Sequence, residues 1–212
     1  MKACLCTHYG PPEEMELREV PSPKPGKGQV VVSVKACGVN FPDALMIQDK
    51  YQFKPNLPFA PGGEIAGFVK EIGEGVSNVK VGDRVCVSIG NSGMAEEALA
   101  DARRCMIVPE NVPFDVASSF MVTYGTTWHA LKDRADLKKG ENLVVLGAAG
   151  GVGTSAVEIG KALGARVIAG ASSQEKVDTA KKLGADDGFV YPPVPLNRDQ
   201  QKQLSEDIKR LT

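Results

Sequence analysis

The stretch that decides the fold is LVVLGAAGGVGT, residues Leu143–Thr154. Its first four residues form a continuous apolar run, which is typical of a strand covered on both faces, and a glycine-rich turn follows. Glycine lacks the Cβ atom that would keep backbone N–H groups away from a pyrophosphate, and the N-terminus of a helix adds favourable partial charge. The stretch therefore predicts a strand, a dinucleotide-binding turn and a helix; a turn with a purely structural role is the alternative. The residues expected at the dinucleotide are Gly150, Gly151, Val152 and Gly153.

Helical patterns alternate with short apolar runs on both sides of this turn. We expect strands at 143–146, 166–169 and 189–191, and helices at 154–163, 174–183 and 199–211. Such alternation indicates βαβ units and a parallel sheet. Residues 122–212 are therefore predicted to form the first half of a Rossmann-type domain, truncated after that half, because a doubly wound domain has two βαβαβ halves. The strand at 143–146 would then keep an unpaired edge.

The first 121 residues have a different pattern. In Val30–Ala36 the apolar residues alternate with polar ones from position 32 onward, as in a half-buried strand. Further strands are expected at 2–6, 65–72, 84–89 and 106–108, with proline and glycine clusters between them, and helices at 115–120 and 127–135. The pattern predicts a compact, irregular β domain over residues 1–121 and an α/β protein as a whole.

Composition excludes several classes of protein. The 212 residues are 42% hydrophobic and 24% charged, with a formal net charge of −1, as in soluble globular proteins. Nucleic acid and membrane are therefore not expected as partners. The N-terminus shows no secretory signal pattern, and the five cysteines are irregularly spaced, which argues against disulfides and a thiolate zinc site. We expect a cytoplasmic protein.

The segment AGASSQEK, residues 169–176, predicts which dinucleotide is bound. A carboxylate at the end of the second strand would bind the ribose hydroxyls of NAD, and this segment has none there. The hydroxyls of Ser172 and Ser173 and the ammonium of Lys176 could instead receive a 2′-phosphate. The segment therefore favours NADPH. In the alternative, Ser172 caps the next helix and Lys176 is solvated.

Three further stretches carry a resemblance to a known family: VKACGVNFPD at 34–43, PGGEIAG at 61–67 and VGDRV at 81–85. With the glycine-rich turn, they resemble the medium-chain dehydrogenase/reductase superfamily and, within it, the zinc-free quinone oxidoreductase-like group. The resemblance implies a GroES-like irregular β domain followed by a Rossmann-type domain. It also implies that no zinc is bound, because zinc-dependent members carry cysteine at the position of Asn40 and histidine at that of Gly63. His8 and His129 are too isolated to replace these ligands.

The resemblance also implies the roles of several side chains. Asn40 would donate an amide hydrogen bond in the nicotinamide and substrate cleft, and Tyr51 would orient substrate or assist protonation. Thr127 would contact the nicotinamide, and Tyr191 would cover the adenosine phosphate end. The alternatives are a turn contact for Asn40, surface packing for Tyr51 and a helix N-cap for Thr127. The family often has a second tyrosine where this chain has Leu45.

Together these features predict a zinc-independent oxidoreductase that transfers hydride from NADPH to a quinone or another conjugated carbonyl acceptor. Without a metal ion, hydrogen-bond donors would stabilise the delocalised oxyanion that forms on such an acceptor. A 2-alkenal or enoyl-thioester reductase and a non-catalytic NADPH-binding scaffold are the alternatives. The full-length form is expected to be a homodimer.

Overall fold

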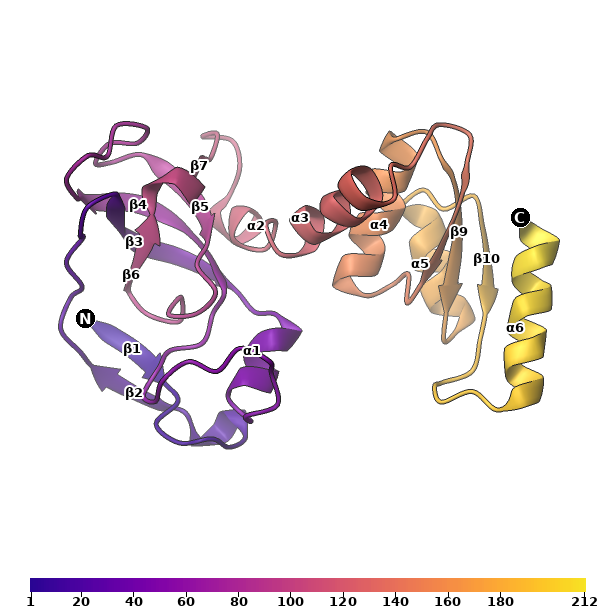
Figure 1. The fold of residues 1–212 in the computed structure, drawn as a ribbon, viewed down its shortest axis with the longest axis horizontal. Coiled ribbons are helices and arrows are strands. Elements are labelled where there is room, and N and C mark those ends of the chain that lie inside the picture. Colours follow the sequence, from indigo (N-terminus) through magenta and orange to yellow (C-terminus); the bar gives the residue numbers. More distant parts are fainter. The chain divides into compact units, whose positions relative to one another are not determined.

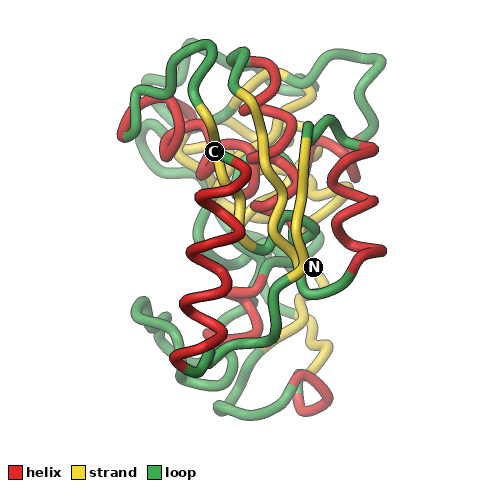
Figure 2. Tube along the Cα trace, turned by 90° about the vertical axis from the view of Figure 1, so that its right-hand side faces the viewer, coloured by secondary structure: helices red, strands yellow, loops and turns green.

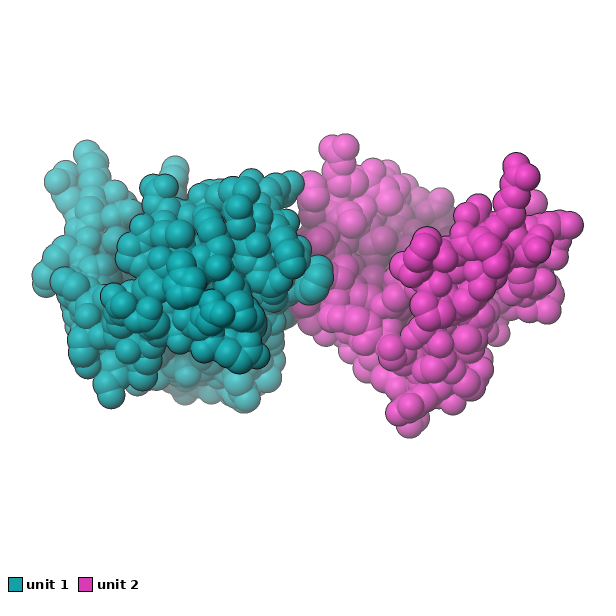
Figure 3. All heavy atoms as spheres, turned by 90° about the horizontal axis from the view of Figure 1, so that it is seen from below, with its two compact units in different colours: residues 1–122 teal, residues 123–212 magenta.

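The computed structural model describes all 212 residues. They divide into two compact units, unit 1 at Met1–Val122 and unit 2 at Thr123–Thr212 (Figure 3). Unit 1 holds an antiparallel β fold and unit 2 holds a parallel sheet with helices. The predicted fold class, a GroES-like β domain followed by the first half of a Rossmann-type domain, is confirmed.

A five-stranded sheet in the order β6-β3-β4-β5-β7 forms the centre of unit 1 (Figure 1). All of its neighbouring strands are antiparallel. The strands are β3 (Gln29–Gly38), β4 (Glu64–Ile72), β5 (Arg84–Ser88), β6 (Glu97–Asp101) and β7 (Met106–Ile107). The core of the unit is built from side chains of these strands, among them Val30, Val32, Ile65, Val69, Val85 and Val87.

Shorter elements surround this sheet. Strands β1 (Lys2–Leu5) and β2 (Glu16–Glu19) form an antiparallel pair. The helical elements of unit 1 are η1 (Pro12–Glu14), α1 (Phe41–Met46), η2 (Ala102–Arg104) and α2 (Phe114–Ser118). The sequence did not predict β2 and β6, because β2 has only one apolar side chain and β6 alternates only through the small residues Ala98 and Ala100.

Unit 2 contains a parallel three-stranded sheet in the order β10-β9-β8. Figure 2 shows its strands side by side, with the C-terminal helix alongside. The strands are β8 (Asn142–Leu146), β9 (Arg166–Ala171) and β10 (Asp187–Val190). The helices are α3 (Thr123–Trp128), the π-helical η3 (His129–Arg134), α4 (Gly151–Ala162), α5 (Gln174–Lys182) and α6 (Arg198–Leu211). The α-helix expected at 127–135 is therefore wrong in part, since the chain is π-helical after Trp128.

The central strand of unit 2 is β9, in which Val167, Ile168 and Ala169 are fully buried. Strand β8 lies at the edge of the sheet, where Val145 is buried but Leu146 is 53% exposed. The expectation that the run 143–146 is covered on both faces is thus wrong in part: Leu143 and Val145 pack in a buried cluster with residues of α4, whereas Leu146 on the opposite face is exposed. The unpaired edge expected for this strand is present, since β8 pairs only with β9. None of the helices combines the length and apolarity that crossing a lipid bilayer requires.

Candidate functional site

The glycine-rich turn of unit 2 joins the end of β8 to the start of α4. Gly147 has a φ of +69°, a conformation that favours glycine, and Gly150 is the N-cap of α4 with an extended backbone. A Cβ atom on Gly153 would lie 2.1 Å from the carbonyl oxygen of Gly147, so only glycine lets α4 pack this closely on the turn. A Cβ on Gly150 would have a single neighbour, at 3.4 Å. The turn therefore leaves open space where a phosphate would meet the first N–H groups of α4.

A cavity of about 250 Å³ lies beside this turn. The structure brings three predicted side chains to it from two different strand ends: Ser172 and Lys176 follow β9, and Tyr191 follows β10. They meet there because parallel strands end at the same edge of a sheet. Gly147, Ala149, Gly150 and Ala171 complete the lining. The size and position of this cavity fit part of a nucleotide.

The two serines that follow β9 have different contacts. Ser173 is the N-cap of α5, where its Oγ accepts a hydrogen bond from the backbone N of Lys176 at 3.4 Å. The alternative that Ser172 caps this helix is therefore wrong. The exposed Ser172 Oγ instead accepts a hydrogen bond from Lys176 Nζ at 3.1 Å. A hydroxyl and an ammonium group thus lie together at the cavity, as an anion site requires.

Two other residues predicted to bind nucleotide are hydrogen-bonded within unit 2. The Tyr191 hydroxyl accepts a hydrogen bond from the backbone N of Gly147 at 3.1 Å. Thr127 is only 2% exposed, and its Oγ1 lies 2.6 Å from Ser155 Oγ on α4. Thr127 is the fifth residue of α3, so the alternative of an N-cap is wrong. Its hydroxyl joins α3 to α4, and a contact with nicotinamide stays a prediction.

Asn40 is the N-cap of helix α1 in unit 1 and forms a capping box with Asp43. The backbone N of Asn40 donates to Asp43 Oδ2 at 2.8 Å, and the backbone N of Gly62 donates to Asp43 Oδ1 at 2.9 Å. The Asp43 side chain is buried. Its carboxylate therefore fixes the position of the Asn40 backbone against the loop before β4.

A second buried carboxylate, Glu64, holds the Asn40 side chain. Glu64 is 1% exposed, and its Oε1 accepts a hydrogen bond from Asn40 Nδ2 at 2.8 Å. Its Oε2 accepts a hydrogen bond from the backbone N of Val122 at 2.9 Å. Sequence reasoning missed Glu64. The available signal was an acidic residue at the head of an apolar strand, in the stretch Pro61–Gly67, because a buried carboxylate needs partners.

Asn40 and Tyr51 line one cavity of about 190 Å³ in unit 1, together with Met46, Phe53 and Ser88. The Tyr51 side chain also packs against a buried cluster that includes Cys6 and Phe59. This packing agrees with the alternative of a packing role for Tyr51, and it also keeps the side chain at the cavity. The structure thus places the two predicted catalytic residues at the same site in unit 1.

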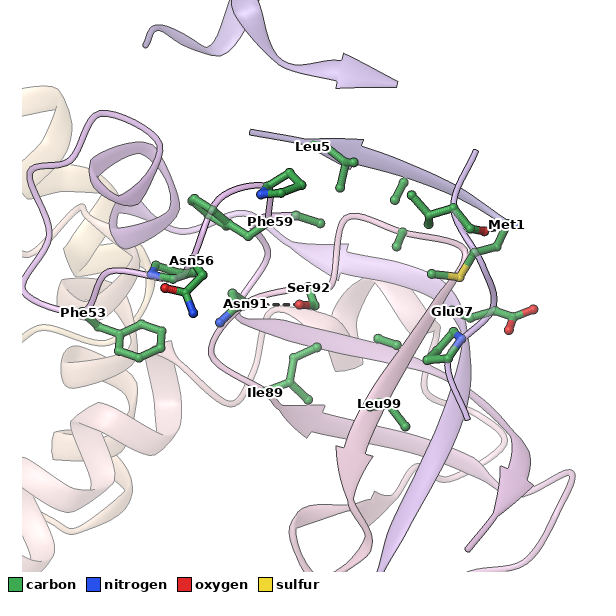
Figure 4. Close-up of a pocket in the computed structure, with 18 residues that line it drawn as sticks. Met1, Leu5, Phe53, Asn56, Phe59, Ile89, Asn91, Ser92, Glu97 and Leu99 are labelled. Atoms are coloured by element: carbon green, nitrogen blue, oxygen red, sulfur yellow. Dashed lines mark hydrogen bonds between the residues drawn. The ribbon is translucent and has the colours of Figure 1, made fainter. Parts of the chain in front are cut away.

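A larger cavity of unit 1, of about 600 Å³, is lined mostly by apolar side chains (Figure 4). Phe53 is shared with the cavity at Asn40, and none of the predicted site residues lies in it. Of its polar residues, Asn91 and Ser92 are hydrogen-bonded to each other at 2.7 Å. The smaller cavity is the candidate site for a reacting carbonyl group, because it is lined by both predicted catalytic residues, Asn40 and Tyr51.

The side chains around Asn40 do not fit a catalytic zinc site. The structure contains no group of three or more His, Cys, Asp or Glu residues that could hold a metal ion. His8 and His129 are exposed and pair with Glu14 and Asp133 at 2.9 and 3.0 Å. Burial raises the pKa of the nearby Cys37 thiol to about 12, and the charges of Asp43 and Glu64 add to this shift.

Two protein families match the sequence. The family described as "Alcohol dehydrogenase GroES-like domain" matches residues 26–156, and "Zinc-binding dehydrogenase" matches residues 151–212. The first match covers more than half of the chain. The chain belongs to the medium-chain dehydrogenase/reductase superfamily, in its quinone oxidoreductase-like group. The resemblance stated from the sequence is thereby confirmed.

Individual relatives from this superfamily are longer than the chain. Quinone oxidoreductase-like protein 2 from Rattus norvegicus is 38% identical over 99% of the chain, which spans 57% of that protein. A mycobacterial protein solved in complex with NADPH has a TM-score of 0.89 and 32% identity, over 100% of this chain and 63% of its own. The quinone oxidoreductase from Thermus thermophilus, also solved with NADPH, has a TM-score of 0.80 and 32% identity, over 97% and 64% of the two chains.

Proposed function

We propose that unit 2 binds NADPH at the turn 147–153. The observation that carries the proposal is the cavity in which Ser172, Lys176 and Tyr191 meet this turn. Gly150, which lines this cavity, leaves room for a diphosphate beside the first N–H groups of α4. The Ser172 hydroxyl and Lys176 ammonium, 3.1 Å apart, offer donors for the 2′-phosphate that distinguishes NADPH from NADH. The two similar structures solved with NADPH support this assignment.

The proposed reaction is the zinc-independent reduction of a quinone or another conjugated carbonyl compound. Bound NADPH supplies the hydride. In unit 1, Asn40 would donate an N–H to the carbonyl oxygen of the acceptor, where negative charge develops, and Tyr51 would orient the acceptor in the cavity. Hydrogen bonds alone support the reduction of a conjugated acceptor better than the oxidation of a simple alcohol, because conjugation spreads the negative charge that develops on the acceptor. The similarity to the quinone oxidoreductase from Thermus thermophilus supports this class of acceptor.

Binding and turnover test the proposal separately. Calorimetry on the 212-residue chain should detect NADPH binding and weaker NADH binding. Stopped-flow absorbance should then show oxidation of NADPH by quinones or enones. Asn40→Ala and Tyr51→Phe should lower the rate and leave nucleotide affinity unchanged. No binding of either nucleotide would refute the assignment to unit 2.

The turnover experiment also separates the alternatives. Binding without turnover of any acceptor would favour a non-catalytic NADPH-binding scaffold, and turnover of only alkenals or enoyl thioesters would move the substrate class to those reductases. The cytoplasmic location and the homodimer of the full-length form stay predictions from the sequence.

A further inference from the structure

We infer that Glu64 is a positioning residue for the proposed reduction. It orients the Asn40 carboxamide so that an N–H, and not the amide oxygen, is presented to the acceptor. An ionised carboxylate only accepts hydrogen bonds. Glu64 Oε1 lies 2.8 Å from Asn40 Nδ2, so the carboxamide must turn its NH2 group, and not its oxygen, toward Glu64. One N–H of Asn40 is used by Glu64, and the other is the donor that remains for an acceptor carbonyl. This inference rests on the proposed function of Asn40.

The Glu64 side chain is itself held in place on two sides. Its second oxygen accepts a hydrogen bond from the backbone N of Val122 at 2.9 Å. On β3, a Cβ atom added to Gly38 would lie 2.7 Å from Glu64 Oε1 and 2.8 Å from its Cγ. Glycine at position 38 therefore gives Glu64 the space it occupies, and the tight packing leaves the carboxylate little freedom to rotate.

Asn40 has a second support that does not depend on Glu64. Its backbone is fixed by Asp43, whose carboxylate accepts hydrogen bonds from Asn40 N and Gly62 N. Asp43 thus sets where residue 40 lies, and Glu64 sets the orientation of its amide. Because the two functions are carried by different carboxylates, the orientation of the amide can be changed while Asp43 still holds the backbone of residue 40.

Glu64→Gln tests the inference, because glutamine has one acceptor oxygen and one donor NH2 group. In either orientation of the glutamine amide, its oxygen can accept from only one of Asn40 Nδ2 and Val122 N, and its NH2 group then faces the other donor. We expect the Asn40 carboxamide to flip and the turnover number to fall about tenfold, while the KM for NADPH stays the same. Glu71→Gln is the control, since it makes the same change on β4 at a side chain that pairs with Lys24 at the surface.

The double variant Asn40→Asp/Glu64→Gln separates positioning from stability. In this variant the NH2 group of residue 64 can donate to the carboxylate at position 40, and its oxygen can accept from the backbone N of Val122. Asp is also as good an N-cap as Asn. No N–H donor returns to the cavity, however. We expect the melting temperature to recover toward the wild-type value and turnover to stay at or below that of Glu64→Gln. Recovery of turnover together with stability would show that no amide donor is needed at position 40, and it would overturn both the proposed role of Asn40 and the inference that rests on it.

NMR of the side-chain amides gives a readout that does not need turnover. The Asn40 NH2 signals, assigned by their loss in Asn40→Asp, should shift in Glu64→Gln and stay in place in Glu71→Gln. Unchanged Asn40 signals in Glu64→Gln would overturn the inference even if the wild-type chain reduces quinones. If the wild-type chain reduces nothing, the proposed function fails, and the NMR result still decides whether Glu64 orients Asn40.

Discussion

The hydroxyl of Tyr191 and the backbone N–H of Gly147 are joined by a hydrogen bond of 3.1 Å. These residues are 44 positions apart in the sequence, one just after β10 and the other at the first glycine of the turn. The tyrosine therefore closes one side of the cavity at Ser172 and Lys176. Its ring and its hydroxyl have separable roles, since the ring covers the cavity and the hydroxyl occupies a donor of the turn.

Variants at Tyr191 should separate these two roles. Tyr191→Phe removes a neutral hydrogen bond at an exposed backbone group, so we expect the NADPH dissociation constant to change by less than about threefold. Tyr191→Ala also removes the ring, and we expect it to weaken NADPH binding by about fivefold or more through lost apolar contact. Calorimetry on both variants provides the measurement. Equal dissociation constants for Tyr191→Ala and the wild type would exclude the ring from the nucleotide site.

Gly153→Ala should disrupt the turn, because the new methyl group would lie 2.1 Å from the Gly147 oxygen and 2.8 Å from Ala148 Cα. Backbone must move to accommodate it, at a cost of about 1–3 kcal/mol, and nucleotide binding should be lost. The matched control is Gly125→Ala in α3, where a Cβ meets nothing within 4 Å. This change should be neutral or slightly stabilising. Thermal denaturation and calorimetry distinguish the two variants, and wild-type binding by Gly153→Ala would contradict the packing argument.

The sequence was most informative where a local constraint has only one solution. The strand, turn and helix at β8 and α4 follow from an apolar run and from glycines that no other residue can replace, such as Gly153. Strand β6 was missed because its buried positions are alanines, which carry little pattern. Glu64 was missed for a different reason: Val122 and Asn40 lie 58 and 24 residues away from it. Only the folded chain shows that they share one carboxylate.

Ser172 and Ser173 also have roles that only the folded chain distinguishes. Both are small hydroxyl residues just before a helix, and either could serve as its N-cap. The extended backbone of Ser173 and its contact with Lys176 N settle the capping role in the structure. That leaves Ser172 beside Lys176 Nζ at the cavity.

Discrimination between NADPH and NADH should therefore depend on Ser172 and Lys176. The double variant Ser172→Ala/Lys176→Gln should raise the dissociation constant of NADPH by about tenfold or more, as expected for losing charge-assisted hydrogen bonds, and should change that of NADH little. Lys181→Gln, in the last turn of α5, removes the same charge away from the cavity and serves as the control. An equal loss for both nucleotides would refute the 2′-phosphate assignment. Ser173→Ala should cost about 1 kcal/mol of stability through the lost cap and leave the NADPH/NADH ratio unchanged.

Thr127→Val tests whether the buried hydroxyl binds nucleotide or only packs. The change removes the contacts of Thr127 Oγ1 with Ser155 Oγ and with the carbonyl oxygen of Val152, while Ser155 keeps its own contacts to the carbonyl oxygens of Thr123 and Val152. We expect a loss of about 1 kcal/mol in the free energy of unfolding and an unchanged NADPH dissociation constant. Thr127→Ser should be close to wild type in both. Weaker NADPH binding by Thr127→Val at unchanged stability would instead support the contact with nicotinamide.

The ion pair between Lys161 and Asp186 should stabilise unit 2 at neutral pH, and this stabilisation should be lost in acid. Lys161 Nζ lies 2.7 Å from Asp186 Oδ1, and Asp186 Oδ2 accepts a hydrogen bond from the backbone N of Val167 at 2.7 Å. The Lys161 hydrogen bond, followed by that from Val167, lowers the pKa of Asp186. A carboxylate whose pKa is lower in the folded state stabilises the fold above its unfolded pKa, and this contribution is lost as the pH falls through the folded value.

Asp186→Asn should therefore lower the melting temperature at pH 7, and the difference from wild type should shrink below about pH 4. Asp178→Asn is the control, since that carboxylate on α5 bonds the neighbouring Gln174 side chain at the surface. A deficit in Asp186→Asn that stays constant from pH 7 to pH 3 would show that the ionised carboxylate is not the source of the stability.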